Sequence, residues 1–333
     1  MAKSDPLVVD IDGDGFDLIS VEDGVYFDED NRNLKEKTQW VAPKDGLLAI
    51  DLNGDGVIND GSELFGTSTV LKDGTLARSG FEALAQYDEN EDGVIDGQDA
   101  VFSRLLIWQD KNSDGISQQD ELLGIQEFGV TSISLNTQAD NGINTSAVTL
   151  ADGSSTKTGE FTFDAHLYDV TEKEEVEYSD EIKELPDVRA IGNIASLRTL
   201  MQTDESGQVK EAVIQFMEAV ASEEREAAVT RLLYLITGAD QIASNSRGGL
   251  MDAKKLTVVE QFMGEEFIGT RGRNPVNTAV PMLEKAYKEI YELYYNCLNE
   301  QTFLKNYINM TCWLTNEAGE KYLDTALFDA YVK

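Results

Sequence analysis

The chain has 333 residues, of which 41% are hydrophobic, so it contains enough apolar material for about two folded domains. Its 62 acidic and 27 basic residues give a formal charge of −35, which excludes a protein that binds nucleic acid by neutralising phosphates and argues against docking on anionic membranes. No apolar run approaches the roughly 18 residues of a membrane-spanning helix. A single histidine excludes multi-histidine zinc chemistry, and two cysteines are too few for a disulfide scaffold.

Near its amino end the chain contains an aspartyl-prolyl bond, Asp5-Pro6. The aspartyl carboxylate of such a bond can attack its own main-chain carbonyl carbon, close a cyclic anhydride and expel the proline nitrogen. A carboxylate held in attack geometry would lower the barrier by about 7–11 kcal/mol. Composition alone favours a simpler interpretation, an ordinary turn or linker, and both interpretations remain open at this point.

Residues 6–65 alternate short apolar runs with acidic loops. Such runs predict strands at residues 7–9, 24–27 and 47–50. The first acidic loop has Asp10, Asp12 and Asp14 at alternate positions, the arrangement of the first half of a calcium loop. A cation held there would immobilise the preceding strand, and with it Pro6.

Two further loops in this region depart from the calcium-loop pattern. The loop that opens at Asp51 has its closing acid, Glu63, at position 13 instead of 12. The loop that opens at Asp28 and Asp30 has Arg32 in the third ligand position, where a cation would otherwise lie. We therefore interpret this second loop as a turn with solvated acids.

Two loops match the pattern D-x-[DN]-x-[DN]-G-x5-E, one from Asp110 to Glu121 and one, with a shorter closing acid, from Asp88 to Asp99. Side-chain oxygens at positions 1, 3 and 5, a carbonyl at 7 and a carboxylate at 12 surround one Ca²⁺. Apolar residues at 81–85, 101–108 and 122–128 predict two adjacent helix–loop–helix units. The predicted ligands of several Ca²⁺ sites are Asp10, Asp12, Asp14, Asp51, Asn53, Asp55, Val57, Asn59, Glu63, Asp88, Asn90, Asp92, Val94, Asp96, Asp99, Asp110, Asn112, Asp114, Ile116, Gln118 and Glu121.

Residues 130–169 alternate again, which predicts strands at 132–135 and 160–163 and an Asn-rich loop at 136–146. The expected fold of the first half is therefore an α+β, EF-hand-like calcium-binding module with short strands. His166 lies in a strand-like run, where a structural role is favoured over protonation of a leaving nitrogen.

The negative charge is concentrated in this first half: residues 1–180 contain 39 acidic and 11 basic residues, and residues 181–333 contain 23 and 16. The acidic stretch 171–184 predicts a domain boundary. Beyond it, helical periodicity predicts an all-α domain with helices at 208–221, 224–237, 251–264 and 278–313. The helically spaced tyrosines in the last segment, Tyr287, Tyr291, Tyr294 and Tyr295, predict packing against a neighbouring helix.

From residue 5 to about residue 170 the sequence resembles the calcium-dependent self-processing module of FrpC-like iron-regulated RTX proteins. The resemblance rests on DPLVVDIDGDG at 5–15, KTQWVAP at 37–43, DGLL at 45–48, GSELFG at 61–66, GFEAL at 80–84 and the Asp110 loop. Arg32 and Asn33 depart from it, because they replace the acid and the glycine usual in the second loop. Residues 186–333 resemble a helical region that can follow this module, through GAD at 238–240, SRGG at 246–249 and DAKKL at 252–256.

The resemblance implies that calcium folds the module and that the Asp5-Pro6 bond is then cut autocatalytically. Asp5 would be the nucleophile, Pro6 the leaving residue, and a lysine of another protein a possible acceptor of the aspartyl group. The expected organisation is a segment ending at residue 5, a module over 6–180 and a helical domain over 181–333. The resemblance also implies part of a larger protein, secreted or at the cell surface through type I secretion. The alternative is a calcium-rigidified binding or spacer module without catalysis.

Overall fold

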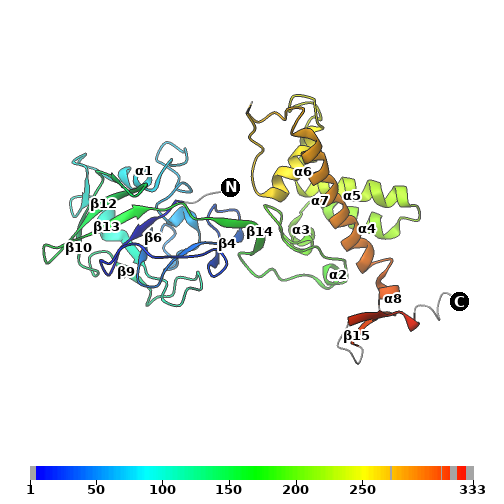
Figure 1. Cartoon of the computed structure of the whole chain (residues 1–333), viewed down its shortest axis with the longest axis horizontal. Coiled ribbons are helices and arrows are strands. Elements are labelled where there is room, and N and C mark those ends of the chain that lie inside the picture. Colours follow the sequence, from blue (N-terminus) through cyan, green and yellow to red (C-terminus); the bar gives the residue numbers. More distant parts are fainter. Residues whose placement is uncertain (1–4, 271, 309, 316–320, 328–333) are drawn as a thin grey trace. The chain divides into compact units, whose positions relative to one another are not determined.

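The computed structural model describes residues 5–270, 272–308, 310–315 and 321–327, and the chain separates into two compact units between Glu174 and Glu175 (Figure 1). The first unit is rich in β-strands, and the second is mostly helical. This mixed α+β composition confirms the expected class in its coarse form. None of the helices in the described part of the chain is long and apolar enough to cross a membrane.

A nine-stranded antiparallel sheet forms the centre of the first unit, in the order β7-β10-β12-β13-β1-β6-β8-β9, with β11 paired to β12. Its strands are β1 (Leu7–Val9), β6 (Gly46–Ile50), β7 (Val94–Asp96), β8 (Leu105–Trp108), β9 (Leu122–Gly124), β10 (Val130–Ser134), β11 (Gln138–Asp140), β12 (Ile143–Leu150) and β13 (Ser155–Glu160). The strand next to the Asp5-Pro6 bond, β1, therefore lies inside the sheet between β13 and β6.

Smaller elements complete the first unit. A three-stranded sheet has the order β14-β4-β3, and β2 pairs with β5. These elements are β2 (Leu18–Ile19), β3 (Val25–Phe27), β4 (Leu34–Thr38), β5 (Trp40–Val41) and β14 (Ala165–Glu172), with the short helices η1 (Gly61–Glu63), α1 (Gly80–Ala85) and η2 (Ala100–Arg104).

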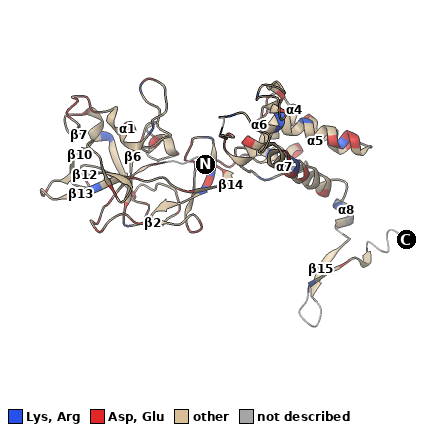
Figure 2. Ribbon diagram, turned by 45° about the horizontal axis from the view of Figure 1, so that its top comes forward, with Lys and Arg blue, Asp and Glu red and all other residues tan. Residues whose placement is uncertain are grey.

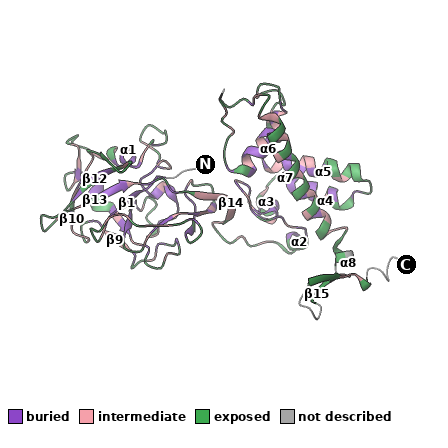
Figure 3. Ribbon diagram, viewed as in Figure 1, coloured by how far each residue is buried: buried purple, intermediate pink, exposed green. Residues whose placement is uncertain are grey.

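Strand β1 is buried on both faces because its side chains alternate between two apolar clusters (Figure 3). Leu7 and Val9 join the cluster of Leu48 and Ile107, while Val8 joins the other. The second cluster contains an aromatic group in which the Trp40 ring lies 5.1 Å from Phe27 and 5.3 Å from Trp108. All three β1 side chains are at most 1% exposed, so this strand is held firmly once the unit is folded.

The predicted strands at 7–9, 24–27, 47–50 and 132–135 are confirmed as β1, β3, β6 and β10, whereas β13 ends at Glu160, where the strand predicted at 160–163 would begin. The prediction of a second helix–loop–helix unit is wrong. Leu105–Trp108 and Leu122–Gly124 are paired strands, and the Asp110 loop joins them as a hairpin. A short apolar run fits a buried strand as well as a helix. The Asp88 loop does follow a helix, α1.

The Asn-rich loop predicted at 136–146 is also wrong. Strands β11 and β12 pair across a two-residue turn at Asn141-Gly142, both with positive φ, 51° and 87°. Asn-Gly is the preferred sequence of a two-residue hairpin turn, because its residues tolerate this left-handed conformation. The flanking residues alternate only weakly between apolar and polar, so the sequence feature that indicates this hairpin is the Asn-Gly turn.

The second unit contains the predicted helices 208–221, 224–237 and 251–264 as α4 (Gln208–Glu218), α5 (Ser222–Ile236) and α6 (Ala253–Met263). The fourth ends early, as α7 (Val280–Gln301) and α8 (Lys305–Ile308), and is followed by the paired strands β15 (Cys312–Thr315) and β16 (Lys321–Asp324), so this unit is not all-α. Threonine, tryptophan and leucine at 311–315 favour the extended backbone. Two short helices, α2 (Asp180–Lys183) and α3 (Leu197–Thr203), and η3 (Ala239–Gln241) were not predicted.

The tyrosines of α7 pack as expected. Tyr287 and Tyr294 are buried in the core of the second unit, and the Tyr294 ring meets Phe262 of α6 edge-on at 5.4 Å. Tyr291 and Tyr295 stack on each other at 6.2 Å. The helical spacing of these rings therefore serves helix packing.

Candidate metal loops and the Asp5-Pro6 bond

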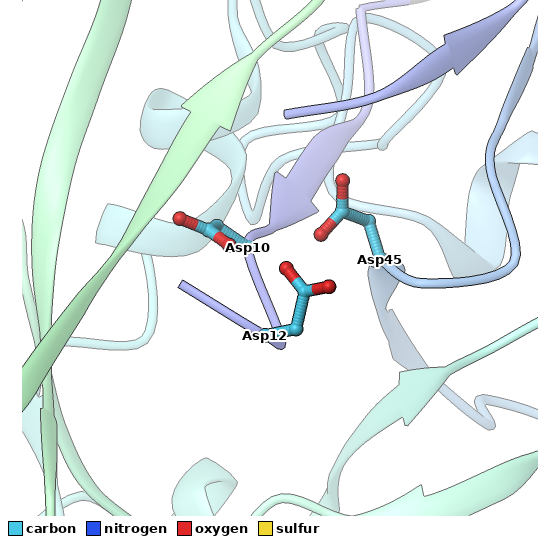
Figure 4. A group of neighbouring side chains, drawn as sticks. All are labelled: Asp10, Asp12 and Asp45. Atoms are coloured by element: carbon cyan, nitrogen blue, oxygen red, sulfur yellow. The ribbon is translucent and has the colours of Figure 1, made fainter. Parts of the chain in front are cut away.

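Acidic residues of the first unit gather in loops at strand ends (Figure 2). In the loop after β1, the carboxylates of Asp10 and Asp12 converge with that of Asp45, with oxygens of all three within 4.8 Å of one another (Figure 4). Asp10 and Asp45 are buried, at 5% and 1% exposure, and burial raises the pKa of Asp45. Three converging carboxylates, two of them buried, supply the kind of oxygen ligands that a cation prefers, so the arrangement is compatible with a metal site.

The sequence pattern misplaced one member of this cluster. Asp14 is not part of it; Lys44 Nζ lies 3.1 Å from Asp14 Oδ2 and 3.4 Å from Asp12 Oδ2, so this lysine pairs with both aspartates. Asp45 takes the third place from a separate loop, before β6, and accepts hydrogen bonds from the backbone N–H groups of Ile11 (3.2 Å) and Asp17 (2.8 Å). The sequence feature that could have indicated Asp45 is its place directly before the apolar strand that begins at Gly46.

The loops opening at Asp51, Asp88 and Asp110 share one backbone conformation. In each, the first aspartate accepts a hydrogen bond of 2.9 Å from the N–H of the sixth residue, Gly56, Gly93 or Gly115. The fourth and sixth residues all have positive φ, including the non-glycine residues Glu91 (57°) and Ser113 (55°). Such left-handed positions are uncommon for these residue types. The repetition brings together the side chains at positions 1, 3 and 5 in all three loops, with position 3 accepting from the N–H of position 5.

The closing acid of each loop occupies an equivalent place. Glu121, Asp99 and Glu63 each accept hydrogen bonds from the N–H groups of the second and ninth loop residues, at 2.8–3.4 Å. Glu63 does so although it stands at position 13, because the short η1 helix turns the chain back by one residue. The extra residue therefore leaves the closure of the Asp51 loop intact, and burial raises the pKa of Glu63.

The Asp110 loop is tied to the aromatic core. Asp110 is 0% exposed, and its Oδ2 accepts hydrogen bonds from Trp40 Nε1 at 2.8 Å and from Gly115 N at 2.9 Å. In the described part of the chain, the Asp88 loop has no counterpart of the tryptophan bond, and its first aspartate is only half-buried. The Asp110 loop is therefore tied to the aromatic core more closely than the Asp88 loop is.

The loop at Asp28 is not a turn with solvated acids. Asp28 is 0% exposed and accepts hydrogen bonds from the N–H groups of Arg32 (2.9 Å) and Asn33 (3.1 Å). Asn31 and Asn33 have φ of 58° and 64°, so this loop keeps left-handed residues at the same two positions. Asparagine tolerates that conformation in place of glycine. The Arg32 side chain turns outward, 45% exposed, and pairs with Asp30 at 3.0 Å.

Sequence reasoning missed Glu36, which completes a second acidic cluster with Asp28 and Asp30. Glu36 lies on β4 and is 6% exposed; burial and the neighbouring carboxylates raise its pKa to about 8. Its Oε2 and the Oδ1 of Asp30 are buried without a hydrogen-bond partner among the described residues. The available signal was a glutamate at an inward position of a strand with alternating burial.

We expect Glu36→Gln to lower the calcium stoichiometry of the chain by one ion, because the amide removes the charge of a buried candidate ligand. Isothermal titration calorimetry measures the change, with Glu22→Gln, an exposed glutamate, as the matched control. An unchanged stoichiometry in Glu36→Gln would remove this cluster from the metal sites.

The Asp5-Pro6 bond enters the sheet at β1. Asp5 is 9% exposed, and its Oδ1 accepts a hydrogen bond of 2.6 Å from the N–H of Thr67. The Pro6 carbonyl accepts from Phe161 N at 3.3 Å. A Cβ at Gly66 would lie 3.4 Å from the carbonyl carbon of Asp5 and the nitrogen of Pro6, so the absence of a side chain there leaves room beside the bond. The aspartyl carboxyl and its own peptide bond are thus fixed from several sides.

A second carboxyl group lies beside Asp5. Glu160, at the end of β13 and opposite Leu7 in register, lies close enough to the Asp5 side chain to act on its pKa. Burial is the main cause that raises the pKa of Asp5 to about 6; the negative charge of Glu160 adds to it, and the bonds from Thr67 oppose it. Glu160 was not among the predicted site residues. His166 lies on β14 and stacks on Tyr168 at 5.3 Å, in agreement with a structural role.

Strands β1 and β13 connect the first acidic cluster to the Asp5-Pro6 bond. At one end, Asp10 N donates to Lys157 O (3.0 Å) and Thr156 Oγ1 donates to Asp10 O (2.6 Å). At the other end stand Asp5 and Glu160. Five residues of extended chain, about 16 Å, separate the two sites, so a cation at Asp10 would fix the same pair of strands that orients the bond.

Comparison with known proteins identifies similar sequences for part of the chain. Residues 7–171 match the family profile described as "SPM domain". Over 205 residues the chain is 40% identical to "Iron-regulated protein FrpA" of Neisseria meningitidis serogroup C, a match that covers 58% of this chain and 18% of that relative. The chain therefore corresponds to a small part of a much longer protein. It is related to the iron-regulated, FrpC-like RTX proteins, and its residues 7–171 belong to the SPM family of self-processing modules.

Proposed function

We propose that the first unit is a calcium-triggered module that cleaves its own Asp5-Pro6 bond. The observation that carries the proposal is a buried aspartyl carboxyl, held beside its own peptide bond at one end of a strand whose other end enters an acidic cluster. The module is taken as residues 6–180, the released segment as residues 1–5, and residues 181–333 as a helical domain.

The chemistry needs one internal attack. An ionised Asp5 oxygen attacks the main-chain carbonyl carbon of Asp5, the bond to the Pro6 nitrogen breaks, and this nitrogen takes up a proton to become a secondary amine. The aspartyl end is then a cyclic anhydride. Water opens it to two carboxyl groups, or a neutral lysine ε-amine of another protein opens it to an isopeptide. An ordinary lysine is mostly charged near pH 7, since its pKa is about 10.4, so water competes well.

Calcium is the cation we assign to the loops, because their alternating carboxylate and amide oxygens and closing acids form the donor set that Ca²⁺ prefers. Without it, the clustered negative charges hold the first unit loose, a state suited to export by type I secretion. Outside the cell, millimolar calcium fills the loops, fixes β1 and orients Asp5. The similarity to FrpA, a much longer protein, supports a setting within a larger polypeptide, and we propose that this polypeptide is secreted.

The test is cleavage of the full chain by millimolar calcium, read by intact mass and by sequencing the new amino terminus. We expect a product that begins at Pro6, and we expect Asp5→Asn to abolish it, because the amide is a poor nucleophile yet still accepts the Thr67 hydrogen bond. Asp23→Asn, at an exposed turn, is the matched control and should cleave normally.

Two outcomes would contradict the proposal. One is a chain that stays intact in calcium while it gains structure, which is the behaviour of a binding or spacer module. The other is a product that forms equally with a chelator present, because the reaction would then not depend on the loops.

A further inference from the structure

We propose that Glu160 is the general acid of this reaction: its carboxyl group holds the proton that the Pro6 nitrogen takes up as the bond breaks. The inference rests on the proposed cleavage at Asp5-Pro6 and adds a second catalytic residue to it.

The position of Glu160 is fixed from both sides. Its Oε1 accepts a hydrogen bond of 2.6 Å from Gly80 N, at the start of α1, and its Oε2 accepts one of 3.2 Å from Asn144 Nδ2 on β12. A side chain at Gly80 would bring a Cβ to 2.6 Å from Phe65 O, so the backbone can approach Glu160 only because this residue is glycine. The carboxyl group of Glu160, on β13, is thus held in place by α1 and β12.

The strand register brings Glu160 to the scissile bond. Glu160 faces Leu7 across the β1–β13 pair, and the next residue, Phe161, donates its N–H to the carbonyl of Pro6. Because Asp5 and Leu7 are two residues apart along the chain that enters β1, their side chains share a face with Glu160, which acts on the pKa of Asp5 and adjoins the residue that holds Pro6. A proton on this pair of carboxyl groups has a short path to the leaving nitrogen.

The reaction requires opposite protonation states on two groups at once, because Asp5 must be ionised to attack while an acid must supply a proton. Two carboxyl groups in contact share one proton readily, since both cannot ionise without repulsion. When Asp5 attacks, the Glu160 carboxyl gives its proton to the Pro6 nitrogen as the carbon–nitrogen bond breaks. The products are the anhydride, the free secondary amine of Pro6 and the Glu160 carboxylate, so atoms and charge balance without another reactant.

The groups that contact this pair are neutral. Among the described residues, Thr67 donates to Asp5, and Gly80 and Asn144 donate to Glu160, while the charge of Glu160 acts on Asp5. The pH dependence of the reaction should therefore report the two carboxyl groups as a pair. Active molecules carry one proton on the pair, which gives a bell-shaped profile with one acidic and one alkaline limb.

The test compares single-turnover cleavage of the full chain and of Glu160→Gln at saturating calcium between pH 4 and 9, with the exposed Glu127→Gln as the matched control. General acid catalysis is typically worth about 10²–10⁴-fold, so we expect Glu160→Gln to cleave about 10²-fold more slowly. Its alkaline limb should disappear, because the group that loses its proton there is gone. Its acidic limb should stay in place, because in both chains Asp5 then ionises beside an uncharged side chain.

Each outcome decides. A Glu160→Gln chain that cleaves within twofold of the wild type, with the same two limbs, overturns the role of Glu160 and leaves the cleavage proposal standing. A wild-type chain not cut at Asp5-Pro6, or an Asp5→Asn chain that is cut, overturns both. If Glu160→Gln fails to fold in calcium by circular dichroism, Glu160→Asp decides instead: it keeps an acid and should keep an alkaline limb, and a profile without one overturns the inference.

Discussion

Removal of calcium is expected to leave the first unit without stable structure. One site at a calcium concentration 100 times its dissociation constant adds about 2.7 kcal/mol to the free energy of unfolding. Several such sites together match the whole stability of an ordinary domain, about 5–15 kcal/mol. Several of the loop acids cannot relax into solvent, because Asp110 is 0% exposed and Asp45 is 1% exposed. In the cluster of Asp10, Asp12 and Asp45, the repulsion between carboxylates acts in a poorly solvated environment when no ion is bound.

The measurement is thermal unfolding of the full chain by calorimetry, in millimolar calcium and in excess chelator. We expect the transition of the first unit to be lost with chelator and to return when calcium is restored. Magnesium should restore it poorly, because this smaller ion keeps its water and demands a stricter geometry. A first-unit transition at the same temperature in both buffers would contradict calcium-driven folding.

The largest effect of a single loop substitution is expected for Asp110→Ala. It removes a metal ligand and also leaves the buried N–H groups of Trp40 and Gly115 without their acceptor. An unpaired buried polar group costs about 1–3 kcal/mol. Asp88→Ala is the matched control, because it removes the first ligand of an equivalent loop whose opening aspartate is half-buried.

Urea unfolding in saturating calcium measures both variants. Asp110→Ala should lower the free energy of unfolding by about 1–3 kcal/mol more than Asp88→Ala does, the share of the tryptophan contact. Equal losses in the two variants would mean that the Trp40 hydrogen bond contributes nothing to stability. A greater loss in Asp88→Ala would contradict the coupling of the Asp110 loop to the aromatic core.

The sequence predicts those parts of the site that lie within one loop. Aspartate and asparagine at alternate positions before a glycine determine the local turn, so the loops at Asp88 and Asp110 could be found from spacing alone. Asp45, Glu36 and Glu160 could not, because each belongs to a segment outside the loop or strand end whose carboxylates it approaches. Their places depend on strand order and register, which local spacing does not contain.

The same limit applies to the fold. Leu105–Trp108 is so uniformly apolar that its periodicity does not separate strand from helix, and only its pairing with β6 and β9 does so. By contrast, the helices α4, α5 and α6 could be predicted because each presents one apolar face with helical spacing to a core.

The central position of β1 determines what remains after the cut. Pro6 lies immediately outside Leu7, and the strand it precedes is paired on both sides by β13 and β6. Under the proposed cleavage, a cut there would leave intact the hydrogen bonds that pair β1 with both of its neighbours, so we expect the large fragment to keep its architecture. The Pro6 carbonyl would stay bound to Phe161 N, which would hold the new amino end in place. The reaction would then need no unfolding, and each molecule would react once and remain folded afterwards.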